Sequence, residues 1–270
     1  MSISGDSDVE GTLSANIETS KSSIKRKRHD GEVESEQQKP TKRKRRSKKP
    51  KDINDADLDG DLGINNGLSK MDARLLSDYV AQRTKRFEPE LSHVELEDRY
   101  IPESAIADTT SWLKPRTTDN LADFIRKFSP KNIDLDKAPS TPGSPHILVI
   151  ASAGLRAAEL VRSLRTFQTK EGKVEKLFAK HIKLKEAIET CGKVRMSFGV
   201  GTPQRVYDLI DNGALKMDKL RVIVLDASHI DTKKRGVLDM KEVQVPLVKL
   251  LAMNNLKERY GKDGLQLLFY

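Results

Sequence analysis

One stretch of the 270-residue chain, residues 198–231, constrains the fold more than any other. An apolar run at 196–200 is followed by Thr202-Pro203, which suit the cap and the first residue of a helix. A second apolar run at 222–225 is closed by Asp226, and continuous apolar runs are typical of strands buried on both faces of a parallel sheet. The pattern predicts strand, helix, strand, with Asp226 at the sheet edge where open α/β folds bind ligands.

The rest of the chain extends this pattern to an α/β fold with a parallel sheet flanked by helices. Apolar spacing predicts strands at 146–150 and 265–270, and helices at 69–87, 121–128, 155–169, 174–188 and 241–260. Ser69 with Asp72 is expected to cap the first helix. Trp112 is expected to anchor an irregular segment at 89–115 by packing. We therefore expect three parts: a tail at 1–66, a helical and irregular N-terminal extension at 67–145 that ends in a Pro-rich linker, and an α/β domain at 146–270.

The first 66 residues are rich in Ser, Lys, Asp and Glu, and they predict a disordered tail because they hold too few apolar groups to offset chain entropy. The net charge is +9 (49 basic against 40 acidic residues), and residues 1–51 with 14 basic and 8 acidic residues hold +6 of it. Two basic clusters stand out: Lys25, Arg26, Lys27, Arg28, and Lys42, Arg43, Lys44, Arg45, Arg46. Such clusters indicate nuclear import signals for an importin, with RNA contact as a compatible use and a merely solvated charge run as the alternative.

Composition argues against several other classes of protein. The single cysteine, Cys191, excludes a disulfide framework and predicts a small buried thiol. No apolar run approaches ~18 residues, so no membrane span is expected, and the polar N-terminus is unlike a secretory signal. The chain is therefore expected to be soluble and intracellular. The five histidines show no ligand spacing, so we expect neither a metal nor a cofactor. Asp226 is expected to bond the turn that follows it.

Two short motifs carry a resemblance to a known family. Thr202-Pro203-Gln204-Arg205 resembles the T-P-G-R motif of DEAD-box RNA helicases, and Val224-Leu225-Asp226-Ala227-Ser228-His229 resembles their V-L-D-E-A-D. The amino-acid sequence at 176–184 and 198–231 is most similar to that of the Cms family of pre-ribosomal complex subunits. The resemblance as a whole covers roughly residues 70–270. The resemblance implies a single degenerate RecA-like domain in a nuclear, nucleolar protein. The implied partners are pre-ribosomal RNA, small nucleolar RNP and proteins of the small-subunit precursor.

The departures from the helicase motifs argue against ATP hydrolysis. Ala227 stands where the resemblance implies the catalytic glutamate, and His229 stands where it implies the last aspartate. No Gly-Lys pair completes the G-x-x-x-x-G-K-[ST] loop that cradles phosphate. The Pro-rich linker at 130–145 occupies the place upstream of 146–150 where a helicase carries that loop, and a second RecA-like lobe is not expected. Because these parts are missing, the chain is not expected to be an enzyme.

What remains is the phosphate-contact side of the motif. In the helicases that this chain resembles, T-P-G-R grips the RNA backbone, and helix N-termini attract anions. Thr202, Pro203 and Arg205 are therefore candidates for RNA contact, joined by Arg156 from a weak match to the helicase R-E-L. The alternatives are that Thr202 only caps a helix, that Arg205 lies in solvent or in a salt bridge, and that Arg156 is a solvated helix residue.

The function expected from these features is that of a non-catalytic assembly subunit in ribosome biogenesis, which binds pre-ribosomal RNA or proteins of the small-subunit precursor. Two alternatives stay open at this point. One is a purely protein-interaction scaffold in the nucleus, and the other is an atypical RNA-dependent ATPase or helicase.

Overall fold

The computed structural model describes residues 55–179, 182–261 and 264–270. These residues belong to one compact unit that spans 46–270. The two predicted import clusters, at 25–28 and 42–46, lie outside the described residues.

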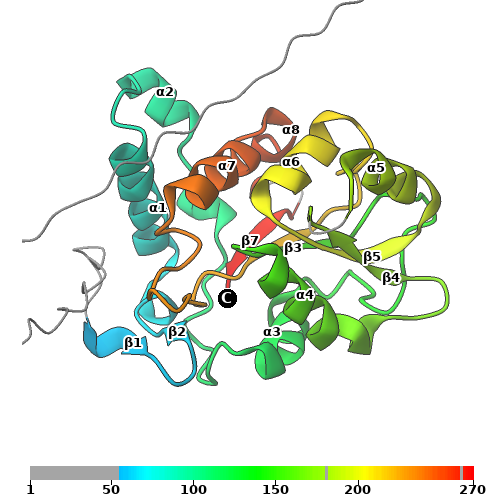
Figure 1. The fold of residues 1–270 in the computed structure, drawn as a ribbon, viewed down its shortest axis with the longest axis horizontal. Coiled ribbons are helices and arrows are strands. Elements are labelled where there is room, and N and C mark those ends of the chain that lie inside the picture. The colour runs from blue at the N-terminus through cyan, green and yellow to red at the C-terminus, as the bar shows by residue number, and fades with distance from the viewer. Residues whose placement is uncertain (1–54, 180–181, 262–263) are drawn as a thin grey trace, which may run out of the picture. The chain divides into compact units, whose positions relative to one another are not determined.

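The centre of the fold is a five-stranded parallel sheet (Figure 1). Its order is β4 (Lys173–Leu177), β5 (Met196–Gly201), β3 (Ile147–Ile150), β6 (Val222–Leu225), β7 (Gln266–Phe269). β3 is the middle strand, and its Ile147 pairs with Phe198 on one side and Val222 on the other. Every residue of β3 and β6 is buried, which explains their unbroken apolar runs. The predicted α/β fold with a parallel sheet flanked by helices is confirmed.

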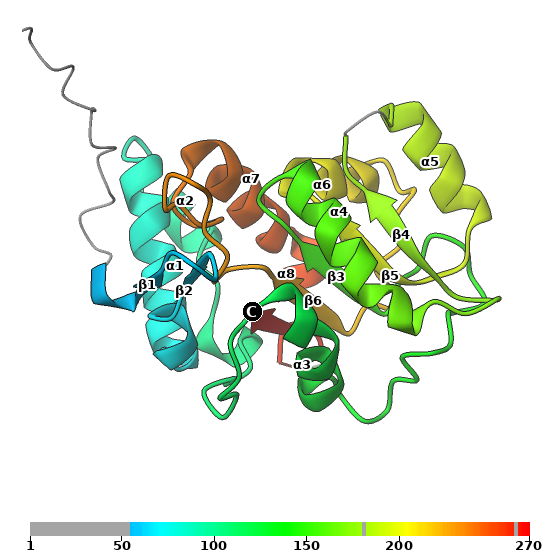
Figure 2. The same cartoon turned by 60° about the horizontal axis from the view of Figure 1, so that its bottom comes forward.

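Helices cover both faces of the sheet (Figure 2). One face packs against α3 (Leu121–Phe128), α4 (Gly154–Ser163) and the 3-10 turn η5 (Leu164–Phe167). The other packs against α1 (Ala73–Phe87), α5 (Leu184–Lys193), α6 (Pro203–Asp211), α7 (Lys241–Leu251) and α8 (Asn254–Lys257). Successive β3 side chains alternate between the two cores, as the pleat requires: Ile147 and Val149 join the first, Leu148 and Ile150 the second.

The N-terminal extension is part of this same unit. α1 lies against α7, and the buried Arg83 guanidinium of α1 pairs with Asp239 at 3.1 Å. Gln244 Nε2 donates to Thr84 Oγ1 at 2.9 Å. Ile106 also forms a parallel bridge to Leu267, which adds a short segment to the sheet beyond β7. Residue 145 is therefore not a domain boundary, because residues on both sides of it share one core.

The segment before α1 corrects the predicted tail boundary. Leu58–Asp59 (β1) and Ile64–Asn65 (β2) pair as a short antiparallel hairpin between the 3-10 turns Asp55–Asp57 (η1) and Leu68–Lys70 (η2). Ile64 and Asn65 are buried. The expectation that disorder extends to residue 66 is therefore wrong for these residues. A polar composition hid the two side chains that enter the core, Ile64 and Leu68.

The predicted helix at 174–188 is also wrong. The structure has β4 at Lys173–Leu177 and α5 at Leu184–Lys193. Val174 and Leu177 have a spacing that suits one helix face, but in β4 they enter different cores on opposite sides of the sheet.

Smaller differences concern helix ends. α1 is capped by Asp72, whose Oδ1 accepts from Leu75 N at 2.8 Å, and not by Ser69. A missed helix, α2 (His93–Asp98), carries a complete capping box between Ser92 and Glu95. The remaining short elements are the 3-10 turns Glu103–Ala105 (η3) and Thr118–Asn120 (η4). The helix predicted at 241–260 is divided into α7 and α8, and the one at 155–169 ends in η5.

The predictions for Trp112 and Cys191 are confirmed. The Trp112 ring is buried, edge-on to Phe124 with 5.5 Å between ring centroids. Cys191 is fully buried, and burial raises the pKa of its thiol to about 11. Within the described residues, no helix combines the length and the apolar content that a membrane crossing requires.

Candidate functional site

The carboxyl ends of β3, β5 and β6 are where an open parallel sheet binds ligands, because the connections from adjacent strands leave toward opposite faces there. α4 follows β3 on one face, and α6 follows β5 on the other. This arrangement brings the predicted site residues to one edge: Arg156 on α4, Thr202 to Arg205 at the start of α6, and Asp226 to His229 after β6.

A buried ion pair joins Arg156 to Asp226 across this edge. Arg156 Nε lies 2.8 Å from Asp226 Oδ2, and Arg156 Nη2 lies 3.1 Å from Asp226 Oδ1, which is a bidentate geometry. Arg156 Nη1 also donates to Glu159 Oε2 at 3.2 Å. Burial works against the charge of Arg156, but the hydrogen bonds and charge of Asp226 outweigh it and raise the pKa of the guanidinium. Arg156 is therefore not a solvated helix residue, and Asp226 pairs with an arginine and not with the turn that follows.

The degenerate motif after Asp226 is held on two sides by other parts of the backbone. Ala227 N and Ser228 N both donate to Tyr270 O, at 2.8 and 2.7 Å. On the other side, Asn65 N, in the β1–β2 hairpin, donates to Ser228 O at 2.7 Å. The Ser228 hydroxyl is buried and has no hydrogen-bond partner among the described residues.

His229 sits half-buried beside the ion pair and forms a β-bridge to Ile64. Burial lowers the pKa of its imidazole, the charge of Asp226 opposes this effect, and the charge of Arg156 adds to it. The ring is thus biased toward its neutral form.

A strand–loop–helix segment also lies at this edge, beside β7. Ala107 N donates to Leu267 O at 3.0 Å, residues 108–117 form the loop, and η4 and α3 follow. This is the order of elements in a P-loop, but residues 108–117 contain no glycine. The Pro-rich linker, in contrast, lies at the amino ends of the strands, where Gly143 N bonds Val194 O. The expectation that the linker takes the place of a phosphate loop is therefore wrong.

Arg116 fills the space inside that loop. Its guanidinium donates through Nη1 to Phe269 O and through Nη2 to Thr109 Oγ1, the latter at 3.0 Å. The side chain is 2% exposed, and burial lowers its pKa to about 10. No sequence signal distinguishes this arginine from others in the chain, so sequence analysis could not have found it.

The start of α6 differs in part from its prediction. Thr202 is the N-cap residue and Pro203 the first helical residue, as expected, but the Thr202 side chain makes no capping hydrogen bond. Arg205 is buried, and both of its terminal nitrogens donate to Ile182 O at 3.1 Å. The contact of these residues, and of Arg156, with RNA stays a prediction, while the structure gives both guanidinium groups internal partners.

Among the described residues, no group of three or more His, Cys, Asp or Glu side chains has the placement to hold a metal ion.

Comparisons with known proteins give the chain its relatives. Among solved structures, a DEAD box protein from the hyperthermophile Methanococcus jannaschii matches 58% of this chain and 37% of its own, with a TM-score of 0.38 and 13% identity. Protein CMS1 of Chaetomium thermophilum is 52% identical over 235 residues, 86% of this chain and 93% of the relative. Human protein CMSS1 is 33% identical over 214 residues, 79% of this chain and 70% of the relative. The family described as CMS1, U3-containing 90S pre-ribosomal complex subunit, matches residues 17–270. The chain therefore belongs to this family of pre-ribosomal complex subunits.

Proposed function

We propose that the protein is a non-catalytic assembly subunit of the small-subunit precursor, which binds pre-ribosomal RNA or its associated proteins in the nucleolus. The observation that carries the non-catalytic part is the state of the sheet's ligand edge, which the chain's own groups close. Arg156 and Asp226 bond each other there, and Arg116 fills the neighbouring loop.

The closure has an energetic consequence for nucleotide binding. A ligand at this edge would have to separate a buried, hydrogen-bonded ion pair, and breaking such a pair costs about 3–5 kcal/mol. Since 1.4 kcal/mol is a factor of ten, nucleotide affinity would fall roughly 100-fold to 4,000-fold. The edge also offers Ala227 in place of a carboxylate to orient an attacking water.

The test is a thermal unfolding measurement with millimolar ATP and magnesium, together with an RNA-stimulated ATPase assay. A ligand at 100 times its dissociation constant stabilises by about 2.7 kcal/mol, so binding would be seen as a clear rise in Tm. We expect no rise and no turnover. A rise in Tm with turnover would instead support the atypical ATPase.

The assembly part of the proposal is supported by the family to which the chain belongs. Its test is sedimentation of cell extract, in which we expect the protein in the heavy fractions that contain U3 RNA. RNA–protein cross-linking in those fractions separates the two forms of the proposal. Cross-linked peptides support RNA binding, whereas cosedimentation without any RNA cross-link supports the protein-interaction scaffold.

A further inference from the structure

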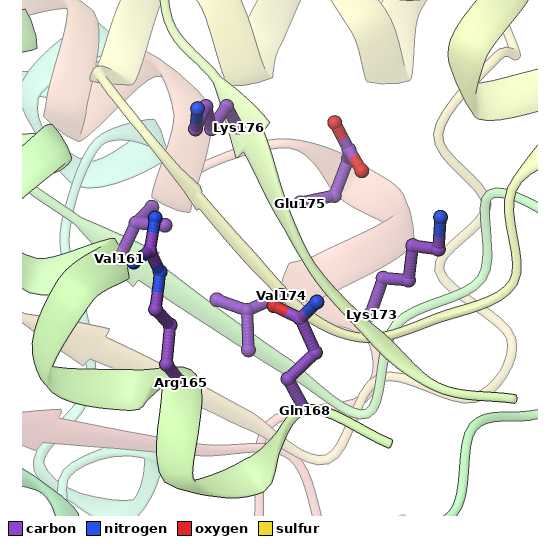
Figure 3. A pocket seen from close by; sticks show the side chains of 7 residues that line it. All are labelled: Val161, Arg165, Gln168, Lys173, Val174, Glu175 and Lys176. Atoms are coloured by element: carbon purple, nitrogen blue, oxygen red, sulfur yellow. The ribbon is translucent and has the colours of Figure 1, made fainter. Parts of the chain in front are cut away.

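The two outer strands of the sheet are β7 and β4. A basic hollow lies beside β4, between this strand and η5 (Figure 3). Its volume is about 630 Å³. Val161 and Val174 form part of the wall, and Arg165, Gln168 and Lys176 reach over it. Figure 3 shows Val174 pointing from β4 toward Val161 and Arg165, while Glu175 points to the other side of the strand.

The cations of this hollow are not paired with the acidic residues that the structure describes. Arg165, Lys173 and Lys176 are exposed, and across the part of the chain that the structure describes none of the three makes an ion pair. Residues 162–176 hold five basic and two acidic side chains, a net charge of +3. Residues 52–270 together hold 35 basic and 32 acidic side chains, also +3. The net positive charge of residues 52–270 is therefore concentrated at 162–176. The basic side chains there repel one another, and a bound anion would relieve that repulsion.

The spacing of the cations indicates an extended anion. Lys173 and Lys176 are three residues apart on the edge strand β4, roughly 10 Å at the usual rise, so they extend to opposite sides of that strand (Figure 3). Arg165 comes from another element. A single phosphate group cannot contact all three. A nucleic-acid backbone can, because it presents phosphates at regular intervals along its length.

The geometry of β4 disfavours the other extended partner, an acidic peptide that adds to the sheet as a strand. β4 carries Lys173 and Lys176, and lysines on an edge strand oppose the pairing of a further strand. Side-chain contacts to phosphates need no strand pairing.

We propose that Arg165, Lys173 and Lys176 form a binding surface for the phosphate backbone of single-stranded RNA, which we name the β4 basic surface. This inference rests on the proposed function and assigns its RNA contact to a place that the helicase-like motifs do not include. Because backbone contacts carry no direct base information, the surface binds with little sequence preference.

The test uses the full chain and a short single-stranded RNA of mixed sequence. One variant combines Arg165→Glu, Lys173→Glu and Lys176→Glu. The matched control combines Lys216→Glu, Lys219→Glu and Lys241→Glu, three exposed lysines away from the hollow with an equal change in charge. Affinity is measured across salt concentrations, and ultraviolet cross-links are mapped to peptides in the wild type.

We expect the β4 variant to lose affinity about 100-fold at 0.1 M salt, and its salt slope to become shallower by about 2, since each lost contact contributes roughly 0.7 for single strands. The control should change much less, both variants should keep the wild-type Tm, and cross-links should map to 162–176.

Three results would overturn the inference. If the wild type binds RNA and both variants lose affinity equally, or cross-links map only to other peptides, RNA binding stands and the β4 basic surface is wrong. If the wild type binds no RNA, the RNA-binding form of the proposed function fails as well. If it binds a polyglutamate peptide instead, and the β4 variant abolishes that binding, the occupant is an acidic protein segment.

Discussion

Two arginines at the carboxyl edge of the sheet, Arg156 and Arg205, use their guanidinium groups inside the protein. Arg156 joins α4 to the end of β6 through Asp226, and Arg205 joins α6 to the turn before α5 through Ile182 O. Each therefore fixes a helix to a neighbouring element, and at the residue scale the first effect of removing either should be on stability.

The Arg156–Asp226 pair gives the largest expected effect. Asp226→Ala leaves the buried guanidinium of Arg156 with the half-exposed Glu159 as its remaining acidic partner, so we expect a loss of about 3–5 kcal/mol in the free energy of unfolding. The control is Glu159→Ala, which removes the half-exposed second partner of Arg156 and should cost no more than about 1 kcal/mol. Urea denaturation measures both. Similar losses for the two variants would contradict a dominant role for the buried pair.

Thr202 and Arg205 should behave in opposite ways. Since the Thr202 side chain makes no capping bond, Thr202→Ala should change stability by less than about 0.5 kcal/mol. Arg205→Ala removes two hydrogen bonds from a charged donor and should cost about 1.5–3 kcal/mol. Chemical denaturation and the salt slope of RNA binding are measured together. If Arg205→Ala left stability intact and made the salt slope of RNA binding shallower, the result would support a helicase-like contact between Arg205 and an RNA phosphate.

His229 predicts a pH dependence. Its pKa is lowered in the folded protein, first by burial, then by Arg156, against the opposing charges of Asp226, Glu159 and Asp231. The unfolded chain therefore binds more protons at this site. The contribution is present above the unfolded pKa of about 6.5 and is lost as the pH falls through the lower folded value. We expect Tm to fall on acidification below about pH 6.5, and to fall less in His229→Gln. Parallel Tm profiles for both proteins would rule His229 out as the cause.

At the scale of elements, the hairpin at 58–65 holds the degenerate motif in place. It buries Ile64 and exchanges backbone hydrogen bonds with residues 228–230 on both its strand and its turn, through Asn65 N to Ser228 O and Ile230 N to Gly63 O. A segment that precedes the first helix thus completes the sheet's ligand edge.

Truncation tests this role. A chain that begins at residue 67 loses the buried Ile64, worth about 1.5–3 kcal/mol, and its Tm should fall by roughly 3–12 °C. A chain that begins at residue 52 keeps the hairpin and should match the full-length Tm. Equal melting temperatures for the two truncations would show that the hairpin does not stabilise the fold.

The elements that could be predicted from sequence are those buried on both sides or bounded by strong end signals. β3 and β6 are unbroken apolar runs, each preceded by a polar residue, and α3 ends at Ser129-Pro130. β4 was missed because its two apolar residues, Val174 and Leu177, are three positions apart, a spacing that also fits one face of a helix. α2 was missed although Ser92 and Glu95 form a capping box that is visible in the sequence, because the whole helix has only six residues.

At the scale of the whole molecule, the sequence located the candidate site but not its internal bonding. The positions of Asp226 and Thr202 at strand ends followed from local patterns. Among the residues that bond to this edge, Arg116 and Asn65 lie 110 and 161 positions before Asp226, and Tyr270 lies 44 positions after it. No local sequence pattern reports such contacts. Long-range contacts therefore set the internal bonding of this edge, and only the structure shows them.

The two basic clusters give the last prediction, which concerns the protein in the cell. Deletion of residues 1–51 removes both clusters while the hairpin and core remain, so we expect the protein to move from nucleus to cytoplasm with its Tm almost unchanged. Deletion of residues 1–20 is the matched control, because it shortens the same end of the chain and keeps both clusters. Fluorescence microscopy of tagged proteins measures the distribution.

A fusion of residues 1–51 to a cytoplasmic fluorescent protein should enter the nucleus by itself, since an import signal acts without the fold that it serves. If the fusion stays in the cytoplasm and the deleted protein stays nuclear, a partner carries the protein in, and the clusters are left with RNA contact as their use.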